Sequence, residues 1–301
     1  MVKHSGTLLG LLLWILAGCE SRWSGGVASR PANAQDSTPK ATSATVPAIL
    51  PAISEVMPSL SGALTKHGID PSSLRVLYRR GEREVYGLRV HGSKAVDLWQ
   101  TLRALVAETG HWPVLLGAGE AEHGTGDEID PRTPEEIIRL GSKLSPTEWL
   151  EKRSAAEPDI YRVKQGNWPK KFKPNKSFTL PFNLLTRKPL PEVVVALVPT
   201  SVSWEVPAYL GFGGWNECPG PEVHVAMLKR WKRLFGAEVV GISDDTMEVQ
   251  VTSPPVSPAQ ALGLAREQFI YCSDIVHQGT LTLENLAAGL LAGRVWYFWW
   301  D

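Results

Sequence analysis

The chain contains 301 residues, of which 31 are basic and 31 acidic, so its formal net charge is zero. A neutral chain argues against nucleic-acid binding that works by bulk electrostatic attraction. Hydrophobic residues make up 43% of the sequence, which is enough for a sizeable core, and the length fits one or two domains. Composition therefore indicates a globular protein and does not identify its activity.

The first nineteen residues, 1–19, read as an export signal. Lys3 provides a short basic start, and residues 8–16 form an apolar run that is too short to remain as a membrane-spanning helix. The run leads into a Leu-Ala-Gly-Cys sequence ending at Cys19, which resembles the lipobox of bacterial lipoproteins. That resemblance implies cleavage before Cys19 and diacylglycerol on its thiol; the alternative is an ordinary signal peptide with an incidental cysteine. Glu20, by resemblance to Gram-negative sorting signals, permits transfer to an outer membrane.

Residues 20–58 are rich in Ser, Ala, Thr and Pro, a composition typical of a disordered tether. A flexible chain of this length reaches on the order of 35 Å. We therefore expect a lipid-anchored protein of the cell envelope whose folded part stays near the membrane without needing to touch it. The folded part divides by pattern into an N-terminal α/β part, residues 59–189, and a C-terminal part, residues 190–301.

The N-terminal part begins with alternating strand and helix patterns. Ser93 and Gly110 are typical start and stop residues of a helix that carries leucines at helical spacing. This helix lies between two short apolar runs, an order typical of a βαβ unit. Two short helices are predicted to follow. The predicted elements are strands over 85–90 and 112–116 and helices over 93–110, 134–140 and 146–153.

Two irregular stretches of the N-terminal part carry charge. Residues 117–130 contain several acids that could offer oxygen ligands to a hard cation, but their spacing matches no known calcium loop, which favours a solvated acidic loop. Residues 165–177 combine four lysines with Trp168 and Phe172. Such a mixture can bind single-stranded nucleic acid. In an exported, neutral protein we instead interpret it as a solvated or lipid-headgroup-facing surface.

The C-terminal part contains a glycine-rich loop between regular elements. Residues 211–221 include glycines, prolines, Trp215 and Asn216, which argue against regular structure and are the residue types that a loop brings to a site. A helix is predicted to begin at Glu222 and to end at Gly236. The other predicted elements are strands over 193–198, 237–241 and 246–251 and helices over 257–272 and 283–291.

Residues 294–301 are predicted to form the last strand, and both of its alternating faces are apolar. A strand that is apolar on both faces is typical of the centre of a sheet that is covered on both sides. We therefore predict an α/β fold, with α+β as the alternative, in which a mixed sheet has this strand at its centre and helices 222–235 and 257–272 beside it. Asp301 ends the strand and places its side chain and the terminal carboxylate at one point.

Several separate motifs in the C-terminal part occur in the order typical of one bacterial family. They are Gly214-Trp215-Asn216-Glu217-Cys218-Pro219, Trp231 with Phe235-Gly236-Ala237, Pro254-Pro255, Ala265-Arg266-Glu267-Gln268-Phe269 with Tyr271-Cys272-Ser273-Asp274, Gln278-Gly279, and the closing residues 296–301. On these motifs, residues 190–301 resemble the domain of unknown function 4253. The resemblance implies no catalytic role. The chain departs from the family pattern at Gln268, Phe269 and Ser273, where His, Tyr and Pro are frequent, so a catalytic His at the first position would be missing here.

Cysteine and histidine offer two candidate chemistries. Cys218 lies six residues before His224, and a turn would let the imidazole act as a base for the thiol, although no Asp neighbour is evident to orient it. Cys272 falls on the core-facing stripe of its helix and is interpreted as a small buried hydrophobe. A zinc site would need three or four ligands from Cys218, Cys272, His224 and His277, and their spacing matches no zinc motif, so no metal is predicted. Whether Cys218 and Cys272 pair in an oxidising envelope depends on their geometry.

Acidic residues recur on another face of the same helix, where Glu267 and Asp274 lie about 10 Å apart along the axis. We predict a site where residues 213–219, the end of this helix and Asp301 converge, because ligands gather at the carboxyl ends of strands. The alternative is structural: Asn216 and Asp301 tie loop ends together through backbone hydrogen bonds. The candidate binding residues are Trp215, Asn216, Cys218, Glu267, Tyr271, Asp274, Gln278 and Asp301.

Two classes of function remain compatible with these residues. The first is a non-catalytic envelope module that binds a protein or a glycan through the Trp215 loop and an acidic pocket. The second is a hydrolase-like enzyme that uses Cys218 or the acids Glu267, Asp274 and Asp301. The sequence contains no complete catalytic triad and no phosphate-binding loop, which favours binding. No cofactor and no nucleic-acid partner is predicted, and the predicted membrane contact is through the lipid on Cys19.

Overall fold

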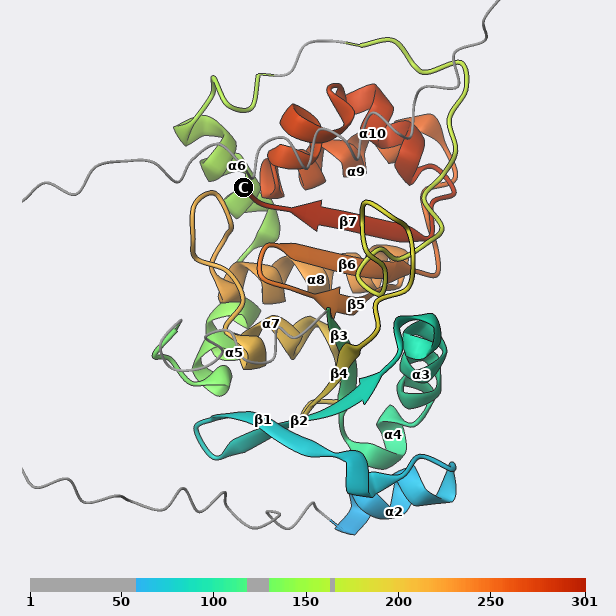
Figure 1. Cartoon of the computed structure of the whole chain (residues 1–301). Coiled ribbons are helices and arrows are strands. Elements are labelled where there is room, and N and C mark those ends of the chain that lie inside the picture. Colours follow the sequence, from blue (N-terminus) through green and yellow to red (C-terminus); the bar gives the residue numbers. More distant parts are fainter. Residues whose placement is uncertain (1–57, 118–129, 163–165) are drawn as a thin grey trace, which may run out of the picture. The chain divides into compact units, whose positions relative to one another are not determined.

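The computed structural model describes residues 58–117, 130–162 and 166–301 (Figure 1). Residues 57–301 form one compact unit. The predicted export signal, almost all of the predicted tether and residues 118–129 of the predicted acidic loop lie outside the described residues. No helix within the described ranges is long and apolar enough to cross a membrane.

The described residues form a seven-stranded sheet in the order β1-β2-β4-β3-β5-β6-β7. Its β3–β5 pair is parallel, and every other neighbouring pair is antiparallel. The predicted mixed sheet with helices, and so the α/β class, is confirmed. The strands are β1 Arg75–Arg80, β2 Arg83–Val90, β3 Trp112–Gly117, β4 Val193–Val198, β5 Ala237–Ile242, β6 Thr246–Val251 and β7 Val295–Trp299.

The helices begin and end near the predicted positions because their caps are local. Thr133, Ser145 and Ser257 each accept a backbone N–H at the start of a helix, as N-cap residues do. One start was misplaced: α3 begins after His91, whose imidazole accepts from the backbone N–H of Ser93. The helices are α2 Pro58–Lys66, α3 Gly92–Ala104, α4 Val106–Thr109, α5 Pro134–Lys143, α6 Pro146–Ala156, α7 Val206–Leu210, α8 Pro221–Phe235, α9 Pro258–Tyr271 and α10 Leu283–Leu290, with short 3-10 turns at Pro71–Ser73 (η1) and Ser203–Glu205 (η3) and a π-helical segment, η4, at Ile275–Thr280.

The predicted βαβ unit is split by a strand from the C-terminal part. Both β2 and β3 run antiparallel to β4, so they point the same way with β4 between them. All six residues of β4 are buried, as expected for a strand inside a sheet. One sheet therefore crosses the sequence boundary between residues 189 and 190, and the two parts share a core.

The last strand does not lie at the centre of the sheet, which corrects the prediction. β7 pairs only with β6 and is an edge strand. Trp296 and Phe298 are nevertheless fully buried, whereas Trp299 on the other face is half-buried. Helices α9 and α10 lie along the outer side of β7 (Figure 1), and the thiol of Cys272 donates to the carbonyl of Trp299 at 3.0 Å. Helices cover this edge as a neighbouring strand would, which is why its sequence is apolar on both faces.

The two helices predicted to flank the last strand do contact it. Trp231 of α8 stacks on Phe298 with ring centroids 5.5 Å apart and meets Trp296 edge-on at 5.7 Å. Tyr271 at the end of α9 packs edge-on against Phe298 at 5.2 Å. These rings form the part of the core on which the candidate residues rest.

An irregular segment, residues 166–192, covers the opposite face of the sheet. Glu248 of β6 pairs with Tyr297 of β7, and alternation places both on the face away from α8. The fully buried carboxylate of Glu248 accepts from the backbone and hydroxyl of Thr179 and from the backbone N–H of Leu180, at 2.6–3.2 Å. Burial raises the pKa of Glu248 above its ordinary value, although these donors oppose the shift. The segment is therefore fastened to the sheet at a defined point.

Candidate functional site

Glycines shape the loop between α7 and α8, which carries three of the candidate residues, Trp215, Asn216 and Cys218. Gly213 and Gly214 have φ of 112° and 92°, values that disfavour any side chain. A Cβ at Gly213 would lie 2.1 Å from the carbonyl oxygen of Pro219 and 2.6 Å from Nε2 of His224. Only glycine therefore lets the loop fold closely over His224.

The loop brings Cys218 to His224 and adds a third group. The Sγ atom of Cys218 lies 3.5 Å from Nε2 of His224, so the pair suggested by the sequence is in hydrogen-bond reach. On the other side of the imidazole, Nδ1 lies 2.5 Å from the hydroxyl of Tyr271, which comes from the end of α9. Tyr271 thus orients His224, a role that the sequence did not reveal because 47 residues separate the two.

The surroundings of this buried triad, Cys218, His224 and Tyr271, keep it neutral. His224 and Tyr271 are fully buried, and the rings of Phe212 and Trp300 flank the imidazole at 5.1 and 5.5 Å. Burial lowers the pKa of His224 to about 3 and raises the pKa of the Cys218 thiol far above its ordinary value. Because desolvation disfavours both charged forms, a thiolate–imidazolium pair is not stable here.

Cys272 is a buried, unpaired cysteine. Both it and Cys218 are free thiols, so the question of a disulfide that the sequence left open is answered in the negative for this structure. Cys272 is fully buried, as its place on the helical stripe predicted, and burial raises its pKa. Its thiol serves as a hydrogen-bond donor to β7. No group of His, Cys, Asp and Glu side chains within the described ranges is arranged to hold a metal ion.

Asn216, Asp274, Gln278 and Asp301 converge at the end of β7. The side-chain amide of Asn216 donates to the main-chain oxygen of Asp301 at 2.9 Å. The backbone N–H of Asp301 donates to Asp274 at 3.1 Å, and Gln278 donates to Asp274 at 3.0 Å. These groups bind one another, so we call the four residues the strand-end clasp. They correspond to the structural alternative rather than to an open acidic pocket.

Trp215 and Glu267 take no part in the hydrogen bonds of the strand-end clasp. Trp215 is half-buried and packs edge-on against Phe212, with ring centroids 5.0 Å apart, so it contributes to loop packing. Glu267 accepts from the guanidinium of Arg230 at 2.7 Å and from the indole of Trp231 at 3.1 Å. The side-chain contacts of Trp215, Glu267 and Asp301 thus involve different partners and do not join the three residues directly.

Glu267 instead lines an open surface cavity of about 360 Å³ between α6, α8 and α9. The sequence did not reveal this cavity because its walls come from three helices that are distant in sequence. Its apolar wall is formed by Leu150 and Ile270. Its polar lining includes Glu151, Arg230, Arg266 and Glu267.

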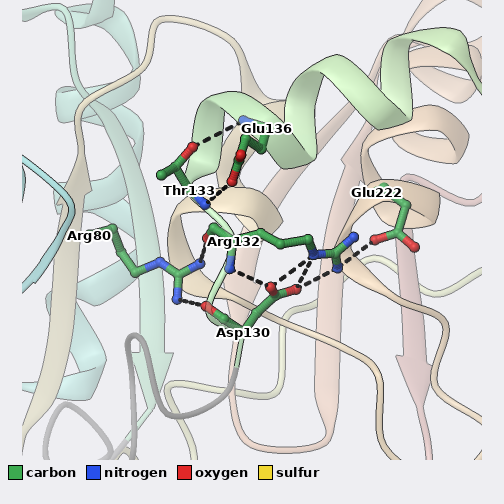
Figure 2. Close-up of polar contacts among 6 residues, drawn as sticks. All are labelled: Arg80, Asp130, Arg132, Thr133, Glu136 and Glu222. Atoms are coloured by element: carbon green, nitrogen blue, oxygen red, sulfur yellow. Dashed lines mark hydrogen bonds and ion pairs between the residues drawn. The ribbon is translucent and has the colours of Figure 1, made fainter.

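A polar network fixes the start of α5 against the start of α8 (Figure 2). Buried Arg80 donates to the carbonyl oxygens of Asp130 and Arg132 at 2.8 and 2.9 Å. Arg132 in turn bonds the Asp130 carboxylate and Glu222, and it lowers the pKa of Asp130. The carboxylate of Asp130, one of the acids that suggested a cation-binding loop, thus already forms an ion pair with Arg132. The other acids of that loop lie outside the described residues.

Comparison with known proteins places the triad and the strand-end clasp in one region. Residues 194–301 match the model of a domain of unknown function, DUF4253. The match covers β4 to the end of the chain and so includes Cys218, His224 and Asp301. The α6 wall of the cavity and the segment over residues 166–192 lie outside it. Neither a curated protein nor a solved structure matches the chain.

Burial of the thiols predicts slow alkylation. In the Cys19→Ser chain, where Cys218 and Cys272 are the remaining cysteines, we expect iodoacetamide to label both thiols slowly in the folded protein and rapidly in denaturant. Burial raises the pKa of both thiols, so very little of the thiolate that iodoacetamide alkylates is present in the folded protein. Mass spectrometry of timed samples measures both rates. Rapid labelling of folded Cys218 would instead indicate an accessible, reactive nucleophile.

The strand-end clasp predicts a modest stability effect. Asn216→Ala removes one donor to Asp301, and we expect the free energy of unfolding to fall by about 0.5–1.5 kcal/mol. Chemical denaturation followed by circular dichroism measures the change. Asn167→Ala is the matched control, because Asn167 is exposed and makes no side-chain hydrogen bond to another described residue. Equal stability of the two variants would contradict a structural role for Asn216.

Proposed function

We propose that this chain is a non-catalytic binding module of the cell envelope and that its ligand binds in the cavity between α6, α8 and α9. The observation that carries the proposal is the cavity itself, about 360 Å³ with an apolar wall and a few charged groups. Ligand sites combine these two features: apolar contact supplies affinity and a small number of polar groups set orientation.

The charged groups of the cavity are held in place. Arg230 donates to Glu267 through Nε and Nη2, at 3.2 and 2.7 Å, and the indole of Trp231 supports the same carboxylate. The pair raises the pKa of Arg230, so its guanidinium stays charged. The Arg230–Glu267 pair therefore forms a fixed polar wall of the cavity, and a wall that is ordered before binding loses little side-chain entropy when a ligand arrives.

Two further side chains suggest the chemistry of the ligand. Arg266 and Glu151 are exposed at the cavity and form no ion pair with another described residue. Guanidinium groups favour carboxylates, and a carboxylate favours an ammonium or amide donor. Together with the apolar wall of Leu150 and Ile270, they support a short peptide or an amino-acid derivative as the ligand. Of the two envelope ligands considered from the sequence, this favours protein over glycan.

The hydrolase alternative lacks a reactive group. Cys218 is buried and neutral beside His224, which leaves it without thiolate character. Glu267 is bound by Arg230, and Asp274 and Asp301 take part in the strand-end clasp. None of the candidate nucleophiles therefore has both an activating partner and access to a substrate.

The envelope location rests on the lipobox at Cys19. We expect Cys19→Ser to abolish lipidation and to move the protein from the membrane fraction to the soluble fraction. Metabolic labelling with a fatty acid and fractionation of cells measure both properties. A variant that loses no label and stays in the membrane fraction would remove the lipoprotein assignment.

The cavity can be filled without disturbing the core. A Cβ at Gly263, an exposed position of α9 on the cavity wall, meets no atom within 4 Å, and the same is true of Gly62 in α2. Both glycines lie inside helices, where replacement by a larger residue is tolerated or mildly stabilising. Gly263→Phe therefore fills the cavity, and Gly62→Phe is its matched control.

We expect thermal-shift measurements with amino acids, dipeptides and tripeptides to identify a peptide that raises the melting temperature of the native chain and of Gly62→Phe but not of Gly263→Phe. A ligand at about 100 times its Kd stabilises a folded protein by about 2.7 kcal/mol, which this method detects. An equal shift in all three proteins would place the ligand elsewhere. No shift with any member of the panel would reject a peptide ligand.

A further inference from the structure

Positive charge is concentrated in one stretch of this neutral chain. Residues 160–191 contain eight basic side chains and no acidic one, whereas the whole chain contains 31 of each sign. The eight are Arg162, Lys164, Lys170, Lys171, Lys173, Lys176, Arg187 and Lys188. A zero net charge therefore conceals a local patch, and local charge determines which surface a protein approaches.

The centre of this stretch, residues 167–177, is held at both ends, and we call it the basic loop. Before it, the backbone N–H of Gly166 donates to Glu284 of α10 at 3.0 Å. Near its end, the carbonyl of Asn175 accepts from the backbone N–H of Arg294 at 3.2 Å, and Thr179 is fastened to the sheet by Glu248. Figure 1 shows this segment running around the outer side of α9 and α10.

The basic loop presents aromatic rings and lysines together. Trp168 and Phe172 are 37% and 43% exposed, which is unusual for such large apolar side chains. Phe172 packs closely against Gly289 of α10, because a Cβ at Gly289 would lie 2.9 Å from the tip of the Phe172 ring. The lysines Lys170, Lys171, Lys173 and Lys176 are all exposed, and none forms an ion pair with another described residue.

Exposed lysines interleaved with half-exposed aromatic rings fit the surface of an anionic membrane. Lysine ammonium groups are attracted to anionic headgroups, and Trp and Phe rings insert at the boundary between headgroups and acyl chains. Single-stranded nucleic acid instead requires free ring faces on which bases stack. The tip of the Phe172 ring packs against α10 at Gly289, so the part that can reach the headgroup layer is the rest of a side chain that is 43% exposed.

We propose that the basic loop is a docking surface for membranes that contain anionic phospholipid. The lysines contact headgroup phosphates, and Trp168 and Phe172 lie at headgroup level. This surface goes beyond the proposed ligand cavity and does not depend on it, because the cavity is lined by α6, α8 and α9. It is also separate from the lipid predicted on Cys19, which would hold the chain near a membrane without orienting the folded unit.

The experiment uses the full chain with Cys19→Ser, so that no lipid anchor contributes. It measures co-sedimentation with vesicles of phosphatidylcholine alone and of phosphatidylcholine mixed with phosphatidylglycerol. We expect binding to the anionic vesicles only, weakened by salt because the attraction is electrostatic. Replacing the four lysines of the basic loop by glutamine lowers the affinity more than about 100-fold, given the usual contribution of each lysine near an anionic surface.

Four other exposed lysines provide a control with the same change in net charge. They are Lys94, Lys143, Lys152 and Lys229, also replaced by glutamine. We expect this control and Gly263→Phe to bind vesicles as the parent does, and all variants to keep the melting temperature of the parent. Failure to bind anionic vesicles, or equal losses in the two quadruple variants, would overturn the proposal. Binding of a single-stranded oligonucleotide in place of vesicles would assign the surface to nucleic acid and would also overturn it.

Discussion

The contact between Trp231 and the last strand is the one on which the rest of the folded unit depends. Its indole stacks on Phe298 with an interplanar angle of 1°, and its N–H donates to Glu267 of α9. Tyr271 meets the same indole edge-on at 5.0 Å. One side chain thus joins β7, α8 and α9, and it satisfies its own polar atom while doing so. Buried aromatic rings contribute large apolar areas, so removing this residue would leave a cavity where three elements meet.

The same packing encloses the cysteine and the histidine and favours their neutral forms. Tyr271 is held by the aromatic core, and its hydroxyl is therefore fixed beside His224. The rings that orient the imidazole also exclude water from it, and without water neither the thiolate nor the imidazolium is stabilised. A short distance between Cys218 and His224 is thus compatible with a structural hydrogen bond. The distance shows that Cys218 and His224 are in contact, and their burial favours the neutral form of each side chain.

Local signals in the sequence predicted the elements well, and long-range pairing was harder to predict. Helix caps such as Ser257 and Gly236 act within a few residues, so the pattern around them is sufficient. The position of β7 was predicted wrongly because a strand covered by helices along its edge has the same apolar pattern as a central strand. Asp274 and Glu267 were grouped as acids of one helix, yet their partners, Asp301 and Arg230, lie on different elements. Only the fold decides which partner each carboxylate meets.

The polar groups of the folded unit differ in whether they already have a hydrogen-bond partner within the protein. The region that matches DUF4253 supplies the buried triad and the strand-end clasp, whose polar groups bind one another. Charged groups that form no ion pair with another described residue include Glu151 and Arg266 at the cavity and the four lysines of the basic loop, and of these only Arg266 lies in the matched region. A polar group whose hydrogen bonds are already made within the protein gains little from a ligand, while an exposed charge without a partner can gain a charge-assisted bond. Interactions with other molecules are therefore expected on the basic loop and at the cavity, where α6, outside the matched region, forms a wall together with α8 and α9, inside it.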